Sequence, residues 1–294
     1  MSVLLTGASG FVGLHMQALR ACTPLPRGVD LQDYDALLHA VKLIQPDAVI
    51  HLAAQSFVPA AFENPRRTFE INFIGTLNLL EALKAICFKG RMIFVGSGDV
   101  YGQVAESAFP VKEDFPLRPR NPYAVSKVAA EALCYQWSQT EGFDVVMVRP
   151  FNHIGPGQSA RFVLSDFAKQ ITEISLGLRP PVLSVGDIDV TRDFTDVRDV
   201  VNAYDLLLKK GKSGAIYNVC SGRDHSIREL LQRLIDFSGV EVRIEQDVAR
   251  MRPAEQRRMV ASYELLHKDV GWQPQISLDK SLEDLLLDWK IKLK

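Results

Sequence analysis

The sequence predicts an α/β protein with a doubly wound parallel sheet and a smaller interleaved α/β lobe. Three observations favour this architecture. In the first half of the 294 residues, short apolar runs alternate with longer amphipathic segments, a pattern typical of βαβ units. A glycine-rich turn at residues 7–13 follows the first apolar run. After Pro150 the alternation gives way to loops and shorter segments, so we expect the second lobe to be smaller.

Each expected element follows from its hydrophobic pattern. Strands are short apolar runs, and helices carry apolar residues three and four positions apart. In the first half we expect strands at 3–6, 47–51, 92–96 and 145–149, and helices at 11–20, 33–45, 69–86 and 123–140. In the second half we expect a loop at 151–161, helices at 166–176, 195–208, 228–237 and 278–290, and a strand at 215–220.

Composition excludes several classes of function. The chain has 34 basic and 35 acidic residues and a net charge of −1, which argues against general binding to nucleic acid or to an anionic membrane. Its four cysteines are scattered, without a CxxC pair or clustered histidines, so we expect no metal site and no disulfide framework. With neither a signal peptide nor a run of about 20 apolar residues, the expected location is the cytoplasm.

The glycine loop predicts a dinucleotide site, and with it a Rossmann-like fold. The loop reads TGASGFVG from Thr6 to Gly13. Gly7 permits a tight turn, Gly10 lets backbone N–H groups approach a pyrophosphate, and Gly13 allows close packing of helix on sheet. Phe11 and Val12 open the helix and complete the expected cofactor contacts. We assign the dinucleotide-binding domain to 1–160 and about 190–215, and the substrate lobe to about 161–189 and 216–294.

The segment that should form the second strand is unusually short. Cys22–Gly28 reads CTPLPRG, which is too rich in proline for a central strand. Asp30 follows at about the distance of a ribose-binding acid, but its context favours a contact to the adenine, together with Leu31. Without a firm ribose carboxylate, Arg20 or Arg27 could attract a 2′-phosphate. We therefore expect NADP, with NAD as the close alternative.

A tyrosine and a lysine on one predicted helix form a candidate catalytic pair. Tyr123 and Lys127 are four residues apart in YAVSK, so both side chains lie on one helix face. A nearby ammonium group favours phenolate and is expected to lower the pKa of the tyrosine. Ser97 follows the strand at 92–96, and ligands of doubly wound folds bind at such carboxyl ends. Its hydroxyl could hold a carbonyl oxygen beside Tyr123.

At this point the chain resembles the extended short-chain dehydrogenase/reductase family. The matching segments are TGASGFVG at 6–13, HLAAQ at 51–55, Asn72, SGDVYG at 97–102, YAVSK at 123–127 and RPFN at 149–152. The resemblance implies that Ser97, Tyr123 and Lys127 are catalytic and that Lys127 contacts the nicotinamide ribose. It implies further cofactor contacts from Leu52, Ala53 and Ala54. It also implies a diphosphate clamp of Asn152, Arg192 and Arg252, with Glu255 on the ribose.

The segments AQSFV at 54–58 and FNHIGPGQ at 151–158 resemble the GDP-mannose branch of this family. The branch implies a GDP-linked sugar substrate, with Val163 and Asp166 near the guanine. Asp99 is expected at the substrate where the branch's dehydratases carry a longer glutamate, so the resemblance favours reduction of GDP-4-dehydro-6-deoxy-D-mannose to GDP-D-rhamnose. GDP-mannose 4,6-dehydration, another nucleotide sugar and a non-enzymatic cofactor sensor remain alternatives. A homodimer through the helices at 69–86 and 123–140 is also expected.

Overall fold

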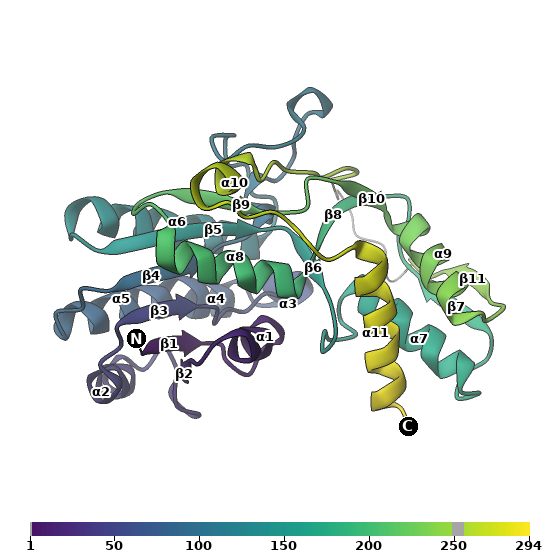
Figure 1. The fold of residues 1–294 in the computed structure, drawn as a ribbon, viewed down its shortest axis with the longest axis horizontal. Coiled ribbons are helices and arrows are strands. Elements are labelled where there is room, and N and C mark those ends of the chain that lie inside the picture. Colours follow the sequence, from purple (N-terminus) through teal and green to yellow (C-terminus); the bar gives the residue numbers. More distant parts are fainter. Residues whose placement is uncertain (1, 249–255) are drawn as a thin grey trace.

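The computed structural model describes residues 2–248 and 256–294, and its centre is a six-stranded sheet (Figure 1). The strands are β1 (Val3–Thr6), β2 (Thr23–Pro24), β3 (Ala48–His51), β4 (Arg91–Val95), β5 (Asp144–Pro150) and β9 (Ile216–Val219). They lie in the order β2-β1-β3-β4-β5-β9, and every pair is parallel. The chain thus runs from β1 to β2 on one side and then crosses to β3 on the other. The predicted doubly wound sheet is confirmed.

Helices cover both faces of this sheet. One face is covered by α1 (Phe11–Leu19), α8 (Val197–Lys210) and α10 (Glu264–Val270), and the other by α2 (Tyr34–Ile44), α5 (Gly75–Ala85) and α6 (Pro122–Thr140). Successive strand residues point to opposite faces, so Leu5 packs in the first layer and Leu4 in the second. Burial on both faces explains why the strands are continuous apolar runs.

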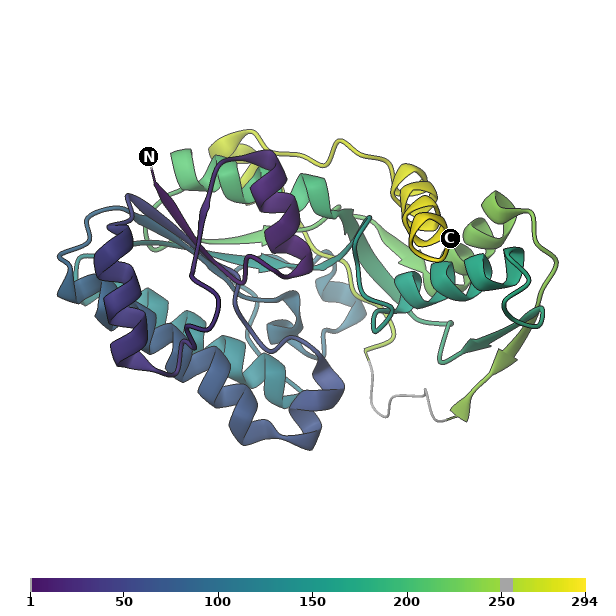
Figure 2. The same ribbon diagram turned by 90° about the horizontal axis from the view of Figure 1, so that it is seen from below.

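A second lobe lies beside this sheet (Figure 2). Its core joins α7 (Val163–Ser175), α9 (Ile227–Ser238) and α11 (Leu278–Lys292) to β7 (Val182–Val185), which pairs with β11 (Arg243–Gln246). A small sheet in the order β10-β8-β6 lies between the lobes and consists of β10 (Asp224–Ser226), β8 (Thr191–Asp196) and β6 (Asn152–Ile154). The short elements are α3 (Val58–Glu63), α4 (Pro65–Phe69), the π-helical turn η1 (Glu70–Ile74), and the 3₁₀ turns η2 (Gly98–Tyr101) and η3 (Glu106–Ala108). In the described part of the chain, no helix is long and apolar enough to cross a membrane.

Four expectations from the sequence are wrong in detail. Thr195 ends up in β8 rather than in a helix, the expected loop at 151–161 contains β6, and the expected helix at 69–86 is interrupted by η1. The segment 216–219, assigned to the substrate lobe, is β9 of the central sheet. In each strand case the pairing partner is distant in sequence, as with β9 beside β5. Local patterns do not report such partners.

A buried ion pair joins α6 to the central sheet. The Nε and Nη2 groups of Arg149 on β5 donate to the two carboxylate oxygens of Glu131 on α6, at 2.8 and 2.7 Å. Arg149 also donates to the hydroxyl of Tyr101 and to the carbonyl of Glu113. Every donor arm therefore has an acceptor, which a buried guanidinium requires. The pair fixes α6 against β5.

Removing the acid of this pair is expected to destabilise the fold strongly. Glu131→Ala leaves the Arg149 charge buried without its carboxylate, and we expect the free energy of unfolding to fall by about 3–5 kcal/mol. Glu141→Ala is the matched control, because Glu141 forms an exposed pair with Lys84 and should change stability by less than about 1 kcal/mol. Urea unfolding of the two variants measures both values. An equal loss of unfolding free energy in the two variants would contradict the stabilising role of the Glu131–Arg149 pair.

Candidate active site

The candidate site residues meet at one edge of the central sheet. Parallel strands end at a common edge, so the segments that follow them lie together there. The glycine loop follows β1, residues 52–54 follow β3, Ser97 closely follows β4, and Asn152 closely follows β5. The structure therefore brings together segments that are up to 145 residues apart in sequence (152 − 7 = 145).

The glycine loop forms a tight cradle beside β3. Gly7 has φ +68°, and a Cβ there would lie 2.8 Å from the nitrogen of Ala53. A Cβ on Gly13 would lie 2.3 Å from the carbonyl oxygen of Gly7. Gly10 donates to that same carbonyl at 3.0 Å and precedes α1. The tight turn predicted at Gly7 is confirmed, whereas Gly13 makes room for the loop backbone of Gly7 and Ala8 rather than for the sheet. The cradle fits a dinucleotide pyrophosphate at the start of α1.

The second strand is as short as the sequence indicates. It covers only Thr23–Pro24, at the edge of the sheet. The guanidinium of Arg20 pairs with Asp205 on α8 at 2.6 Å, which removes Arg20 as a candidate for a 2′-phosphate. The exposed carboxylate of Asp30 accepts from the backbone and side chain of Gln32, whereas the Leu31 side chain is buried in the core.

Helix capping and burial fix the positions of Ser97, Tyr123 and Lys127. Asn121 accepts a hydrogen bond from the backbone of Ala124 at 2.7 Å and so caps α6, which carries Tyr123 and Lys127 in its first turns. Both side chains are buried, and the Lys127 ammonium lies 5.0 Å from the centre of the Phe94 ring. The hydroxyl of Ser97 accepts from the backbone of Asp99 at 3.2 Å, which caps η2.

Burial dominates the electrostatics of this pair. Desolvation raises the pKa of Tyr123, the Asp99 carboxylate raises it further, and the Ser97 hydroxyl lowers it. The expected lowering by Lys127 is therefore wrong in this structure, because loss of water outweighs any attraction from the ammonium. A tyrosine with a raised pKa stays protonated near neutral pH, as a proton donor must. Burial also lowers the pKa of Lys127 to about 8.

The expected substrate residues lie mostly in and around the small sheet. Asn152 on β6 donates to the carbonyl of Asp193 at 3.4 Å, and Arg192 lies on the neighbouring strand β8. Val163 begins α7 and is exposed. Asp166 lies in the first turn of α7 and accepts from Gln170 at 2.7 Å. Arg252 and Glu255 lie outside the described residues.

One buried acid escaped the sequence analysis. Asp193 is fully buried on β8 and accepts hydrogen bonds from the backbones of Ser221 and Gly222, at 2.7 and 3.0 Å, and from the Ser221 hydroxyl at 2.6 Å. Burial raises its pKa to about 6. It fixes the segment that follows β9 against the small sheet. The only local signal was its position directly after Arg192.

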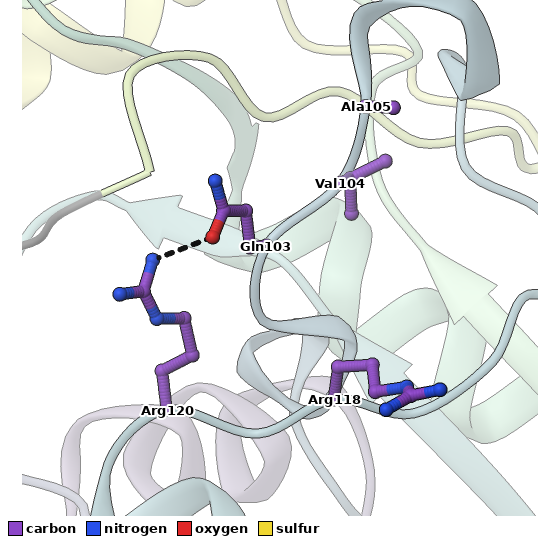
Figure 3. A pocket seen from close by; sticks show the side chains of 5 residues that line it. All are labelled: Gln103, Val104, Ala105, Arg118 and Arg120. Atoms are coloured by element: carbon purple, nitrogen blue, oxygen red, sulfur yellow. Dashed lines mark hydrogen bonds between the residues drawn. The ribbon is translucent and has the colours of Figure 1, made fainter.

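A hollow of about 500 Å³ opens between the segments 103–105 and 118–120 (Figure 3). It is lined by Gln103, Val104, Ala105, Arg118 and Arg120. These residues lie between Ser97 and Tyr123 in sequence, and Arg120 donates to the side-chain oxygen of Gln103 at 3.0 Å. The backbone of Val104 also exchanges two hydrogen bonds with the Gln256 side chain. These hydrogen bonds connect one residue that lines the hollow to the segment before α10.

Comparison with known proteins identifies the family. The model of the GDP-mannose 4,6 dehydratase family matches residues 27–285. The chain belongs to this family. A Pseudomonas aeruginosa member, GDP-6-deoxy-D-mannose reductase, is 52% identical over 99% of this chain and 98% of its own length. The Vibrio cholerae GDP-mannose 4,6-dehydratase is 29% identical over 87% of this chain and 76% of its own length.

Solved structures agree with this assignment. The P. aeruginosa protein RMD, complexed with NADPH, is 52% identical and superposes with a TM-score of 0.94 over 99% of both chains. The Thermus thermophilus UDP-glucose 4-epimerase, complexed with NAD, is 30% identical with a TM-score of 0.87 over 99% of both chains. The resemblance to extended short-chain dehydrogenases/reductases and the Rossmann-like fold are therefore confirmed. The chain is an NAD(P)-dependent oxidoreductase of this type that acts on nucleotide sugars.

The buried lysine is expected to destabilise the protein when no cofactor is bound. With its pKa lowered from 10.5 to about 8, a charged Lys127 costs about 3 kcal/mol at pH 7. Lys127→Met should therefore raise the free energy of unfolding by up to that amount. Between pH 8 and 10.5 the unfolded wild type holds this proton and the folded protein does not, so the advantage should shrink as the pH rises.

Urea unfolding at pH 7 and pH 10 measures this effect. Lys89→Met, at an exposed lysine, is the control and should change little at either pH. A Lys127→Met variant that is less stable than the wild type at both pH values would show that the ammonium group stabilises the fold.

Proposed function

We propose that this chain reduces the 4-keto group of GDP-4-dehydro-6-deoxy-D-mannose with NADPH and releases GDP-D-rhamnose. The observation that carries the proposal is the position of Ser97, Tyr123 and Lys127 at the sheet edge that also holds the glycine cradle. The 52% identity over nearly the whole chain to a GDP-6-deoxy-D-mannose reductase supports the substrate. The NADPH complex of the 52% identical structure supports the cofactor.

In the proposed ketone reduction, Ser97, Tyr123 and Lys127 each have a separate role. NADPH, when bound, supplies the hydride that C4 of the sugar accepts. Tyr123 donates its proton to the developing oxyanion at O4, and burial keeps that proton in place until then. The hydroxyl of Ser97 donates a hydrogen bond to the same oxygen and orients it. Lys127, one turn after Tyr123, is assigned to the nicotinamide ribose, as the family resemblance implies.

We assign the central-sheet lobe to the cofactor and the second lobe, with the small sheet, to the sugar nucleotide. Asn152 and Arg192 lie on neighbouring strands, and a guanidinium suits a diphosphate through its forked geometry. Arg252 and Glu255 complete this clamp in the proposal. Val163 and Asp166, in the first turn of α7, are assigned to the guanine base. Asp99 is assigned to the substrate, and Leu52 and Ala54 are assigned to the cofactor, as the family resemblance implies.

The loop after β2 is consistent with a preference for NADPH. Arg27 is exposed, and within residues 2–248 and 256–294 it has no carboxylate partner. Asp30, three residues later, forms an exposed pair with Arg67 at 3.8 Å, and hydrogen bonds from Gln32 lower its pKa, so its carboxylate stays charged. The exposed guanidinium of Arg27 suits the 2′-phosphate that distinguishes NADPH from NADH.

Reduction and dehydration are distinguished by their substrates. Purified protein is mixed with GDP-mannose, with GDP-4-dehydro-6-deoxy-D-mannose, and with 4-keto sugars linked to UDP or dTDP, each with NADPH or NADH. We expect reduced cofactor to be consumed only with the GDP-linked ketone and faster with NADPH. Conversion of GDP-mannose without net consumption of cofactor would instead show a dehydratase.

Replacing the proton donor is expected to stop turnover without affecting cofactor binding. Tyr123→Phe should lower kcat by about 10²- to 10⁴-fold, the usual contribution of general acid catalysis. Its affinity for NADPH, measured by fluorescence titration, should stay near the wild-type value. Tyr135→Phe, at an exposed tyrosine on the same helix, is the control and should keep full activity. Normal turnover of Tyr123→Phe would disprove the mechanism.

We also propose a cytoplasmic homodimer. Four free cysteines are consistent with a reducing compartment. The outer face of α6 and the turn before α5 expose apolar side chains, among them Val125 at 40% and Ile74 at 39%. Exposed apolar side chains on neighbouring helices are typical of an interface. The second copy of the chain is the proposed partner.

Charges on this face are expected to separate the dimer. Ile74→Asp combined with Val125→Asp places two carboxylates in the proposed interface, and sedimentation should change from dimer to monomer. Leu178→Asp, at an exposed leucine of the second lobe, is the control and should leave the dimer intact. A wild-type protein that sediments as a monomer would overturn the proposal.

A further inference from the structure

A buried chain of polar groups runs from the glycine loop to the catalytic helix. Its members are Thr6, His51, Thr76, Asn72 and Ser126, all at most 2% exposed. Buried polar groups are costly unless each donor finds an acceptor. His51 lies at the end of β3 and contacts Thr6 on β1 at 2.7 Å and Thr76 on α5 at 3.0 Å.

The neighbours of His51 determine which ring nitrogen carries the proton. The hydroxyl of Thr76 donates to the carbonyl of Asn72 at 2.7 Å, so it can only accept from His51 Nε2, which must carry a hydrogen. Nδ1 is then an acceptor and receives the hydroxyl hydrogen of Thr6. The Thr6 oxygen accepts in turn from the backbone of Ala53 at 3.1 Å. Every group in the chain is satisfied only with this tautomer.

The far end of the chain reaches the catalytic helix. Asn72 lies in the π-helical turn η1, a distortion that is common at functional sites. Its side-chain amide donates to Ser126 at 2.9 Å, and the Ser126 hydroxyl donates to the carbonyl of Tyr123 at 2.7 Å. Asn72 also exchanges two hydrogen bonds with the backbone of Gln55. One side chain thus connects η1, the segment after β3 and the first turn of α6.

We infer that His51, as the neutral Nε2–H tautomer, is a positioning residue for hydride transfer that aligns the catalytic helix with the cofactor cradle. The inference rests on the reduction proposed above. One end of the polar chain is hydrogen-bonded to Ala53 beside the cradle, and the other end is hydrogen-bonded to Tyr123 on α6. The chain therefore sets the distance between the cradle and the side chains of Tyr123 and Lys127. Burial and the nearby Lys127 ammonium lower the pKa of His51 to about 3, so the link stays neutral throughout the working pH range.

The kinetic test removes the hydrogen bond between His51 and Thr76 on α5. Thr76→Val keeps the shape of the side chain but removes the hydroxyl, while the bonds from Ala53 to Thr6 and from Thr6 to His51 remain. We expect kcat to fall about tenfold to hundredfold, the effect of a misalignment of about 1 Å, with KM for NADPH unchanged. Thr76→Ser restores the hydroxyl and should restore kcat. Thermal unfolding verifies that both variants are folded.

A second measurement does not depend on turnover. In protein with ¹⁵N-labelled histidine, the His51 signals are identified by their loss in His51→Phe. They should report the Nε2–H tautomer from pH 8 down to about pH 5. A folded Thr76→Val variant with wild-type kcat, or a His51 ring protonated at Nδ1, would overturn the inference. Absence of wild-type turnover on every ketone would instead refute the proposed function and leave the tautomer result intact.

Discussion

The site depends on one topological constraint, the crossing of the chain from one side of β1 to the other. β1 pairs with β2 on one side and with β3 on the other, so the loops that follow β1 and β3 diverge and leave space between them. Gly7 and Ala53 lie at the base of this space, directly after β1 and β3. There the two backbones are so close that no room is left for a Cβ on Gly7. Since β4 and β5 end at the same edge, strand pairing places Ser97 and the small sheet on the side of the sheet that also holds the cradle.

Burial then sets the chemistry at this edge. The same desolvation raises the pKa of Tyr123 and lowers the pKa of Lys127, which favours the neutral form of both groups. A neutral tyrosine is a proton donor, so the environment suits reduction of a ketone. The arrangement opposes stability, because the fold must hold a lysine in a site where its charge is poorly solvated. The buried pair of Arg149 on β5 and Glu131 on α6 is the contrasting case, a charge whose partner compensates for the loss of water.

Local sequence predicts the parts of this molecule that local physics determines. The glycine loop, the strand before Ser97 and the helix of Tyr123 and Lys127 all lie where the patterns place them, because glycine geometry and hydrophobic period act over a few residues. The errors fall where distant partners decide. Thr195 is in a strand because β8 pairs with β6 and β10. Arg20 forms an ion pair with Asp205 on α8, which lies far away in the sequence. Asp193 and the polar chain through His51 are equally invisible locally. The partners of the Asp193 side chain lie at 221–222 and at 261, and the polar chain joins residues of β1, β3, η1, α5 and α6.

The interleaving of the lobes follows from the same pairing and has a mechanical consequence. β9 belongs to the central sheet, yet it leads directly to Ser221 and Gly222, whose backbones donate to Asp193 on β8. β8 pairs with β6, which begins two residues after β5 ends. Two adjacent strands of the central sheet, β5 and β9, therefore both continue into one small sheet. The small sheet that carries Asn152 and Arg192 is therefore attached to the central sheet by two neighbouring strands and a buried carboxylate, which opposes rotation of these two residues away from the edge that holds Ser97 and Tyr123.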